Sequence, residues 1–239
     1  GADFVATGHY VSIKKKAGAY ALYTAKDKNK DQSYFLWTLT QKELAHCLFP
    51  LGAITKPDVR KIAVKLGLVT ANKKDSQGIC FLGKVPAAEF LKHYIPARAG
   101  TIVTPDGIQI GEHDGAEFYT IGQRHGLKIG GHKNPLYVTS KNVQKNTITV
   151  AEGETNPDLY RTEVALENMN VIAGKFFTKP LAVRARIRYR QPLFEAILYM
   201  GNNRTGILTF RKPQKAVAVG QSAVLYGTSG KMLGGGIIS

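Results

Sequence analysis

The sequence is poor in cysteine, in long apolar runs and in acidic residues. Its 239 residues include only two cysteines, Cys47 and Cys80. Two thiols exclude a disulfide-stapled scaffold and a four-cysteine zinc site made by this chain alone. No apolar run approaches the roughly 20 residues that a membrane-spanning helix needs, and the N-terminal stretch lacks the layout of a secretory signal. With 44% hydrophobic and 21% charged residues, the composition is that of a globular protein.

The scarcity of acidic residues gives the chain a large positive charge. Lysine and arginine number 33 against 17 aspartates and glutamates, so the net charge is +16. Residues 181–239 hold nine basic residues and one acidic residue, and this quarter of the chain carries half of the excess. Such a balance favours a polyanionic partner, either nucleic acid or an anionic membrane, over a basic surface kept for solubility alone. The sequence has no basic amphipathic helix with a broad apolar face, which favours nucleic acid.

Residues 1–84 combine strand and helix patterns. The expected strands cover 3–10 and 19–25, and the expected helices cover 40–51 and 56–66. Thr40 and Glu43 form a capping-box pattern at the start of the first helix, whereas Pro57 and Gly67 suit the start and the end of the second. This alternation indicates the tail of an α/β domain.

Short β-rich runs separated by turns follow residue 84, after one more helix predicted over 86–94. The expected strands of the middle part cover 100–103, 136–139 and 147–150, with Asn146 at a hairpin tip. From residue 163 the expected strands cover 181–190, 195–200, 206–210, 222–226 and 231–238. Their regular spacing favours a small barrel. The sequence thus predicts a mixed α/β part followed by all-β parts, with domains at 1–84, 85–162 and 163–239.

The two cysteines differ in their surroundings. Cys80 follows a glycine-containing loop and the pair Lys73 and Lys74, and nearby positive charge favours the reactive thiolate. From the local sequence alone, however, packing as a small buried hydrophobe is the better interpretation of Cys80. Cys47 shares a predicted helix face with Leu44, where a packing role is the better interpretation.

Two segments carry side chains suited to nucleic acid. The run 30–36 joins Lys30, which can meet a phosphate, to Gln32, which can read a base edge. On its own, however, this run is better interpreted as a helix start capped by Asp31. The run 183–190 alternates arginine with other residues, so a regular strand would place four arginines on one face. Arginine forks suit phosphate oxygens, and without interleaved acids the four would repel one another on a merely solvated face.

Two glycine segments carry weaker signals. Gly8 and His9 follow a predicted strand, and nucleotides bind at the carboxyl edge of strands in α/β domains. The run 234–236 is three glycines with no helix after it, which is unlike a phosphate loop. A bent strand or a close backbone contact is the better interpretation of that run.

Taken together, the segments resemble the tRNA-specific 2-thiouridylase family. The matching pieces, in the order of the family, are 6–10 (ATGHY), 30–36 (KDQSYFL), 75–81 (DSQGICF), 119–126 (YTIGQRHG), 188–191 (RYRQ) and 213–217 (PQKAV) with 220–221 (GQ). They cover nearly the whole chain, and the pieces at 75–81 and 119–126 are the most specific.

The resemblance implies an ATP-pyrophosphatase-type domain, a small central β domain and a C-terminal β-barrel. It implies an enzyme that adenylates the wobble uridine of tRNA with ATP and Mg²⁺, and then transfers sulfur from a cysteine persulfide. Cys80 would carry the persulfide, Gly8 would touch ATP, and His9 would lie near the tRNA. Further tRNA contacts would be Lys30, Asp31, Gln32, Arg188, Tyr189 and Gln221, with no metal-ligating residue.

The same resemblance implies the partners and the compartment. The partners would be a wobble-uridine tRNA and a sulfur-donor protein, with no membrane. The protein would act as a monomer in the bacterial cytoplasm, and a mitochondrial location is the alternative.

The sequence departs from the family by lacking its Ser-Gly-Gly-Val-Asp-Ser loop and its first catalytic cysteine. We expect both to lie upstream of Gly1, so that this chain alone does not adenylate tRNA. Arg188 and Tyr189 would point to opposite faces of a regular strand, so both can meet RNA only at a strand end, a bulge or an edge.

Two functions of other classes compete with this one. The chain could be a non-catalytic RNA-binding module built from β domains. A cysteine hydrolase using Cys80 and one of six histidines is the weakest alternative, because no histidine or acid sits in a recognisable nucleophile motif.

Overall fold

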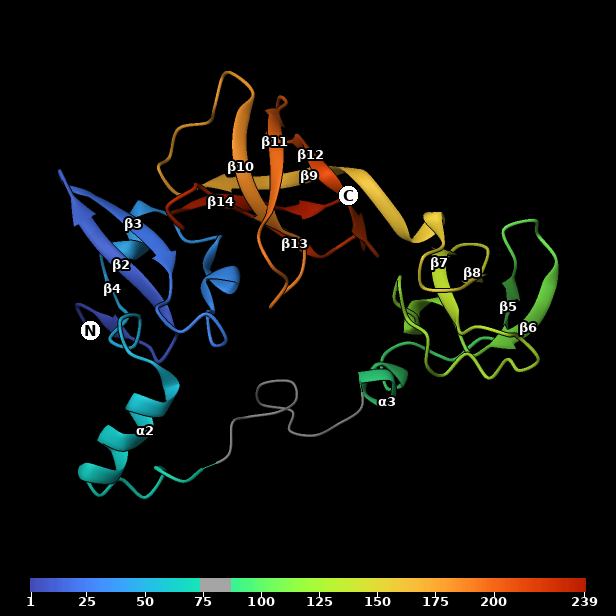
Figure 1. The fold of residues 1–239 in the computed structure, drawn as a ribbon, viewed down its shortest axis with the longest axis horizontal. Helices are drawn as coiled ribbons and strands as arrows, with labels where there is room; N and C mark the ends of the chain where they lie inside the picture. The colour runs from blue at the N-terminus through green and yellow to red at the C-terminus, as the bar shows by residue number, and fades with distance from the viewer. Residues whose placement is uncertain (74–86) are drawn as a thin grey trace. The chain divides into compact units, whose positions relative to one another are not determined.

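The computed structural model describes residues 1–73 and 87–239, which form two compact units (Figure 1). The first unit contains Gly1–Lys73, Thr162–Pro213 and Val219–Ser239, and the second contains the described residues from Ala87 to Arg161 together with Gln214–Ala218. The N-terminal part and the C-terminal strands therefore share one unit, although they are far apart in the sequence. The boundaries at 84 and 162 stay a prediction.

A closed six-stranded barrel dominates the first unit. Its strands are β9 (Tyr160–Val171), β10 (Leu181–Arg186), β11 (Phe194–Met200), β12 (Gly206–Lys215), β13 (Ser222–Tyr226) and β14 (Met232–Ile238). They follow the order β10-β11-β12-β9-β14-β13 around the barrel. Alternate residues point inward, and Leu198, Leu208 and Phe210 are almost fully buried. The predicted barrel is confirmed, but the strand expected over 181–190 ends at Arg186.

The glycines of β14 allow strands to approach closely, as the sequence predicted. A Cβ atom on Gly234, whose φ is +148°, would lie 1.9 Å from the carbonyl oxygen of Asn170. One on Gly235 would lie 2.7 Å from the carbonyl oxygen of Ala223 and 3.0 Å from the Trp37 ring. The register of β14 shifts between Gly235 and Ile237 where it pairs with β9. These glycines serve the barrel and not a phosphate loop.

The N-terminal hairpin packs onto the barrel through one apolar core. It consists of β2 (Val11–Lys16) and β3 (Ala19–Thr24), joined at Ala17 and Gly18, which both have positive φ. Two such residues form the tight turn that matches strand twist. The core joins hairpin, connecting and barrel residues: Val11, Leu22, Tyr34, Trp37, Leu44, Phe49, Ile172, Val224, Tyr226 and Met232. This core fixes residues 10–49 against β13 and β14.

Two predictions about the N-terminal part are wrong in extent. The strand expected over 3–10 is the two-residue β1 (Val5–Ala6), and Val5 is 59% exposed instead of buried. The helix expected over 40–51 is the single turn α1 (Gln41–Leu44), although Thr40 and Glu43 do form the capping box. The chain then pairs as β4 (Cys47–Leu48) in parallel with β1. Strand pairing with a distant segment therefore overrides the local helix pattern.

The second predicted helix of this part is confirmed as α2 (Lys56–Lys65). Thr55 caps it, Pro57 lies in its first turn, and Gly67 follows it with φ +65°. None of its residues is buried. A short 3-10 helix, η1 (Ser33–Leu36), completes the described elements between β3 and α1.

The second unit is a four-stranded sheet with short helical segments. It contains α3 (Ala87–Lys92), β5 (Gly100–Val103), β6 (Gln109–His113), η2 (Ala116–Phe118), β7 (Leu136–Asn142), β8 (Thr147–Glu152) and η3 (Pro157–Leu159). The strand order is β6-β5-β8-β7, and β5 and β8 run parallel. Asn146 has φ +49° at the hairpin tip, as predicted, and its Nδ2 donates to the carbonyl oxygens of Arg98 and Ala99.

Within the described ranges, no helix is long and apolar enough to cross a membrane. The same residues contain no group of three or more His, Cys, Asp or Glu side chains that could hold a metal ion.

Candidate nucleic-acid interface

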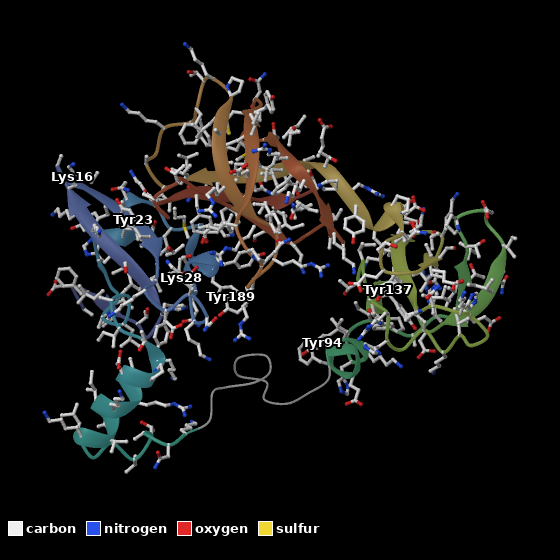
Figure 2. All side chains as sticks on the ribbon, viewed as in Figure 1. Lys16, Tyr23, Lys28, Tyr94, Tyr137 and Tyr189 are labelled. Carbon is white, nitrogen blue, oxygen red and sulfur yellow. The ribbon has the colours of Figure 1, made fainter. Side chains whose placement is uncertain are left out.

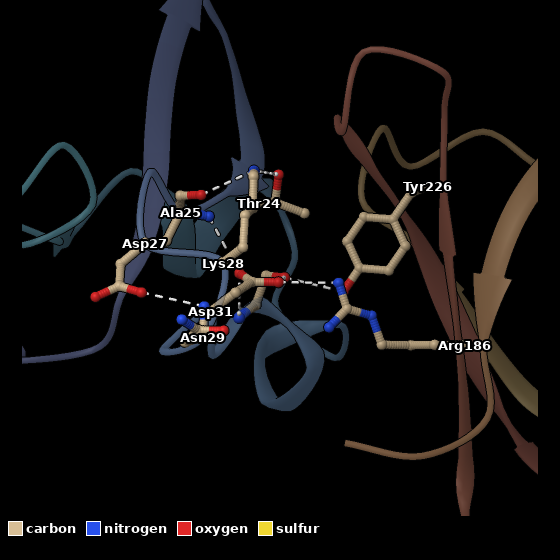
Figure 3. A network of polar contacts seen from close by, with 9 residues as sticks. Thr24, Ala25, Asp27, Lys28, Asn29, Asp31, Arg186 and Tyr226 are labelled. Carbon is tan, nitrogen blue, oxygen red and sulfur yellow. Dashed lines mark hydrogen bonds and ion pairs between the residues drawn. The ribbon is translucent and has the colours of Figure 1, made fainter. Parts of the chain in front are cut away.

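Asp31 lies in the segment 30–32, which follows β3, and it is 4% exposed. Its Oδ1 accepts hydrogen bonds from the backbone N–H groups of Ala25 and Ser33, at 3.1 and 3.3 Å. Its Oδ2 accepts from the Ser33 hydroxyl at 3.1 Å and from Arg186 Nη2 at 2.9 Å (Figure 3). Four donors fill the acceptor positions of a carboxylate. The Asp31 side chain is thus committed to the protein interior.

Arg186 closes this network from the barrel. It is 7% exposed at the end of β10, and its guanidinium lies 5.0 Å from the centre of the Tyr226 ring. The Tyr226 hydroxyl lies 2.9 Å from the Ser33 hydroxyl, and burial raises the pKa of Tyr226 to about 12. The predicted four-arginine anion-facing strand is therefore wrong at Arg186, because Asp31 neutralises it from a distant part of the chain.

Arg188 and Tyr189 lie beyond the end of β10, in a turn. A strand end is one of the arrangements in which both side chains can face the same ligand. The turn is braced by Gln191, whose Oε1 accepts a hydrogen bond from the backbone N–H of Ile187 at 2.9 Å. Arg190 follows with φ +64° and is exposed.

Tyr189, which is labelled in Figure 2, belongs to an aromatic group that joins the two segments. Its ring lies 4.5 Å from that of Phe35 and 6.2 Å from that of Tyr34, measured between centroids. Phe35 is 51% exposed, and the Arg190 guanidinium lies 5.4 Å from the centre of the Tyr189 ring. Exposed aromatic rings beside arginine are suited to stacking of unpaired bases. Sequence reasoning gave Phe35 and Arg190 no separate role, although both stand inside the motifs.

Gln32 connects the segment 30–32 to Tyr10. Its Oε1 accepts a hydrogen bond from the Tyr10 backbone N–H at 3.1 Å, and its own N–H donates to the Tyr10 carbonyl at 2.9 Å. His9 precedes Tyr10, is half-buried, and has Nδ1 2.9 Å from the Thr7 hydroxyl. Lys30 is also half-buried. Gln32 thus fixes the backbone of Tyr10, which follows His9, next to the segment that carries Lys30.

Gln221 stands next to Ser222, which contacts the aromatic segment. The Ser222 carbonyl accepts from the Tyr34 hydroxyl at 2.9 Å, and its Oγ accepts from Trp37 Nε1 at 3.0 Å. Gln221 itself is half-buried, and its carbonyl accepts from the N–H of Ile238. These bonds hold Gln221 close to the 30–37 segment.

Gly8 and Cys80, the two residues predicted to bind ATP and to carry sulfur, have few or no contacts that the structure describes. Gly8 is exposed, and a Cβ atom placed on it would meet only Leu51 Cδ1, at 3.9 Å. Open space beside a glycine after β1 leaves room for a ligand. Cys80 lies outside the described residues. Cys47 is a half-buried free thiol in β4, not on a helix face as predicted, and burial followed by the charge of Glu43 raises its pKa.

The motif 119–126 forms a braced loop in the second unit. Gly122 and Gly126 both have φ +82°. Gln123 Oε1 accepts from the Thr120 N–H at 3.0 Å, and its Nε2 donates to the His125 carbonyl at 2.9 Å. Arg124 and His125 are exposed. The loop therefore has a fixed backbone that presents two basic side chains.

Comparisons with known proteins agree with the motifs. Residues 1–84 match a model described as the tRNA methyl transferase HUP domain, residues 88–152 a tRNA methyl transferase PRC-barrel domain, and residues 161–238 an aminomethyltransferase beta-barrel domain. The chain is 47% identical to the tRNA-specific 2-thiouridylase MnmA 1 of Geobacillus kaustophilus, over 94% of this chain and 61% of that protein.

Two other relatives extend the match to the whole chain. It is 43% identical to the tRNA-specific 2-thiouridylase MnmA of Shouchella clausii and 46% identical to that of Salmonella typhimurium. In both cases 100% of this chain is covered, with 65% and 66% of the relative. The chain thus spans slightly less than two thirds of the length of these curated relatives. On these matches, the chain belongs to the tRNA-specific 2-thiouridylase family.

Proposed function

We propose that this chain binds tRNA and supplies the sulfur-carrying cysteine of a tRNA 2-thiouridylase. The observation that carries the proposal is the junction of the 30–32 segment with the 188–189 turn. The Asp31–Arg186 bond and the Tyr34–Phe35–Tyr189 contacts hold these two motifs together. The motifs of the family therefore meet in space, on a chain of net charge +16, which suits a polyanion.

The roles within this surface follow from exposure and bonding. Tyr189 and Phe35 offer rings to unstacked bases, and Lys30 and Arg188 offer charge to phosphates. Gln32 Nε2, which has no hydrogen-bond partner among the described residues, can donate to a base edge. His9 and Gln221 would extend the contact on either side. Asp31, whose acceptors are filled, positions its neighbours instead of touching RNA.

The chemical step assigned to this chain belongs to Cys80. ATP, with Mg²⁺, supplies an adenylate that makes the 2-oxygen of the wobble uridine a good leaving group. The terminal sulfur of a Cys80 persulfide then bonds to C2, and AMP departs with that oxygen. A second thiol then attacks the Cys80 sulfur, forms a disulfide with Cys80 and breaks the bond from Cys80 to the transferred sulfur, which stays on C2 as the thiocarbonyl. The raised pKa of the half-buried Cys47 makes Cys47 a poor candidate for this second thiol.

The residues described here fit ATP only in part. Gly8 leaves open space after β1, which suits close approach of a nucleotide. The glycine-rich loop that cradles pyrophosphate in this family is not in the sequence. We therefore expect this chain by itself to bind tRNA weakly and to release no AMP from ATP and tRNA. We further infer that the protein acts as a monomer in the bacterial cytoplasm with a sulfur-donor protein.

Intact mass spectrometry tests the role of Cys80. After incubation with a cysteine desulfurase and cysteine, the chain should gain the mass of one sulfur atom, and Cys80→Ser should not. Cys47→Ala is the matched control and should still gain it. Persulfide in Cys80→Ser, or none in a well-folded Cys47→Ala, contradicts the assignment.

A non-catalytic RNA-binding module is the second candidate, and the cationic, aromatic surface would serve it equally well. That function predicts tRNA binding without persulfide on either cysteine. For the surface itself, Tyr189→Ala should weaken tRNA binding about tenfold, since base stacking on an aromatic ring contributes roughly 1–3 kcal/mol. Tyr199→Ala, which removes another partly exposed tyrosine of the barrel, should leave binding unchanged.

A further inference from the structure

A pocket in the first unit carries positive charges to which the proposed function assigns no role. This pocket of about 440 Å³ lies between the segment after β3, the end of β10 and the β13–β14 turn. Its charged lining residues are Lys28, Asp31, Arg184, Arg186 and Arg190. Figure 3 shows Lys28, Asp31 and Arg186 around this place. Since Asp31 and Arg186 neutralise each other, three cations remain.

Lys28, Arg184 and Arg190 differ in how many of their donors protein groups already occupy. Arg184 and Arg190 are exposed, and neither forms an ion pair within the described part of the chain. Lys28 Nζ donates to the Thr24 hydroxyl at 2.8 Å and to the Ala25 carbonyl at 2.9 Å. These bonds hold the ammonium in place and leave its third N–H for an acceptor. Glu195 lies opposite Arg184 on β11 but pairs with Arg211 at 3.0 Å, and Asp31 is the one acid among the described residues that line the pocket. The three neighbouring cations therefore repel one another unless an anion joins them.

The β13–β14 turn adds neutral donors to the same pocket. Thr228 and Ser229 line it and are exposed. Their hydroxyls and backbone N–H groups make no hydrogen bond with other described residues. The turn itself is held by Gly227 and Gly230, whose N–H groups donate to the carbonyls of Lys231 and Gly227. Backbone N–H and hydroxyl donors beside arginine are the usual partners of phosphate oxygens.

Arg186, which also lines the pocket, has one buried nitrogen without a hydrogen bond within the ranges that the structure describes. Arg186 Nε is buried and has no hydrogen-bond partner among the described residues. The guanidinium is nonetheless fixed by Asp31 on one side and the Tyr226 ring on the other. The floor of the pocket is therefore preorganised, while its rim carries the exposed arginines.

We propose that this pocket binds a backbone phosphate of the tRNA, next to the base-stacking surface of Tyr189 and Phe35, with which it shares Arg190. The proposal rests on the proposed function, because it takes tRNA as the ligand. Lys28, Arg184 and Arg190 supply the charge, and Thr228 and Ser229 supply neutral donors. Arg186 is a positioning residue that holds the 24–31 segment against the barrel. A phosphate there anchors the backbone but reads no sequence.

The test compares tRNA binding by two double variants over 50–300 mM salt. Arg184→Gln with Arg190→Gln should weaken binding about tenfold and should lower the slope of log K against log salt by roughly 1 to 2. Lys175→Gln with Lys179→Gln removes the same charge from exposed positions of the same unit and should have a much smaller effect. Fluorescence of Trp37, the single tryptophan, reports whether each variant is folded. Equal effects of the two double variants overturn the pocket while leaving tRNA binding intact.

Pyrophosphate and polyglutamate distinguish other sources of negative charge. If the wild-type chain binds no tRNA, the proposed function fails, and binding of pyrophosphate to wild type but not to the arginine variant then identifies a small-anion site and overturns the phosphodiester assignment. Preference for polyglutamate over tRNA identifies an acidic protein partner and overturns it as well. Binding of none of these ligands overturns the pocket itself.

Discussion

Arg186 Nη2 donates a hydrogen bond of 2.9 Å to Asp31 Oδ2, between side chains that are 8% and 3% exposed. The two residues are 155 positions apart in the sequence. Each stands within two positions of candidate tRNA contacts, Asp31 between Lys30 and Gln32, and Arg186 before Arg188. One buried ion pair thus determines where two separate candidate tRNA-contacting motifs stand relative to each other.

Breaking this pair should destabilise the first unit strongly. Asp31→Asn or Arg186→Gln each leaves a buried group unpaired, which typically costs about 3–5 kcal/mol. The double variant should cost less than the sum of the two, because neither partner is left alone. Urea unfolding followed by Trp37 fluorescence measures all three. The exposed pair Arg211 and Glu195, whose side chains are 80% and 67% exposed, is the matched control and should show little coupling. Additive costs at the buried pair would contradict this account.

The Tyr226 phenol should make the first unit sensitive to alkaline pH. Its pKa is raised from 10.0 to about 12 in the folded protein, chiefly by burial. The neutral phenol therefore favours folding, and this contribution is fully present below pH 10 and is lost as pH rises to 12. The loss should be on the order of 2 kcal/mol. Tyr226→Phe should be less stable at pH 8, because it lacks the bond to Ser33, but should decline less between pH 10 and 12. Parallel declines in the two proteins would show that Tyr226 does not titrate in this way.

Gly234→Ala should unfold or severely destabilise the barrel. The new methyl group would clash with the Asn170 carbonyl, and the φ of +148° at Gly234 is strained for alanine. Relieving the clash would require the paired strands to move apart. We expect a loss of more than about 3 kcal/mol. Gly130→Ala is the control, since nothing lies within 4 Å of a Cβ atom there, and its effect should stay within about 0.5 kcal/mol. A folded Gly234→Ala with unchanged urea midpoint would contradict the close strand approach.

Gln123→Ala should loosen the 119–126 loop without unfolding the second unit. The substitution removes the bonds to the Thr120 N–H and the His125 carbonyl, which brace the turn between the two positive-φ glycines. Amide hydrogen exchange in residues 120–126 should speed up at least tenfold, whereas exchange in β7 and β8 should stay slow. Gln109→Ala replaces an exposed glutamine of the same unit and should leave the loop unchanged. Unaltered exchange in Gln123→Ala would mean that the glycines alone fix the loop.

The sequence predicted those features that depend on local patterns. The regular spacing of short β-rich runs predicted the barrel, and Thr40 with Glu43 predicted the capping box. The helix predicted over 40–51 was too long, because Cys47 and Leu48 form a strand that pairs with Val5 and Ala6. The helix pattern around Thr40 cannot reveal this pairing with a distant segment. Arg186 was assigned to an anion for a similar reason. Its counter-charge, Asp31, becomes a neighbour only in the folded chain. The pocket between the β3 segment and the β13–β14 turn likewise depends on contacts between distant segments.

The joining of the N-terminal hairpin to the barrel also bears on the order of events during synthesis. Ser33 meets Tyr226, 193 residues later, and the Thr24 N–H meets the Gly230 carbonyl. At about 5–20 residues per second, a ribosome needs about 10–40 s to add the residues between Ser33 and Tyr226. During that time Leu22 of the hairpin and Trp37, which follows η1, have no barrel to cover them. These apolar residues therefore lack their native partners during this interval, and the candidate tRNA-contacting surface is completed only when the last two strands have emerged.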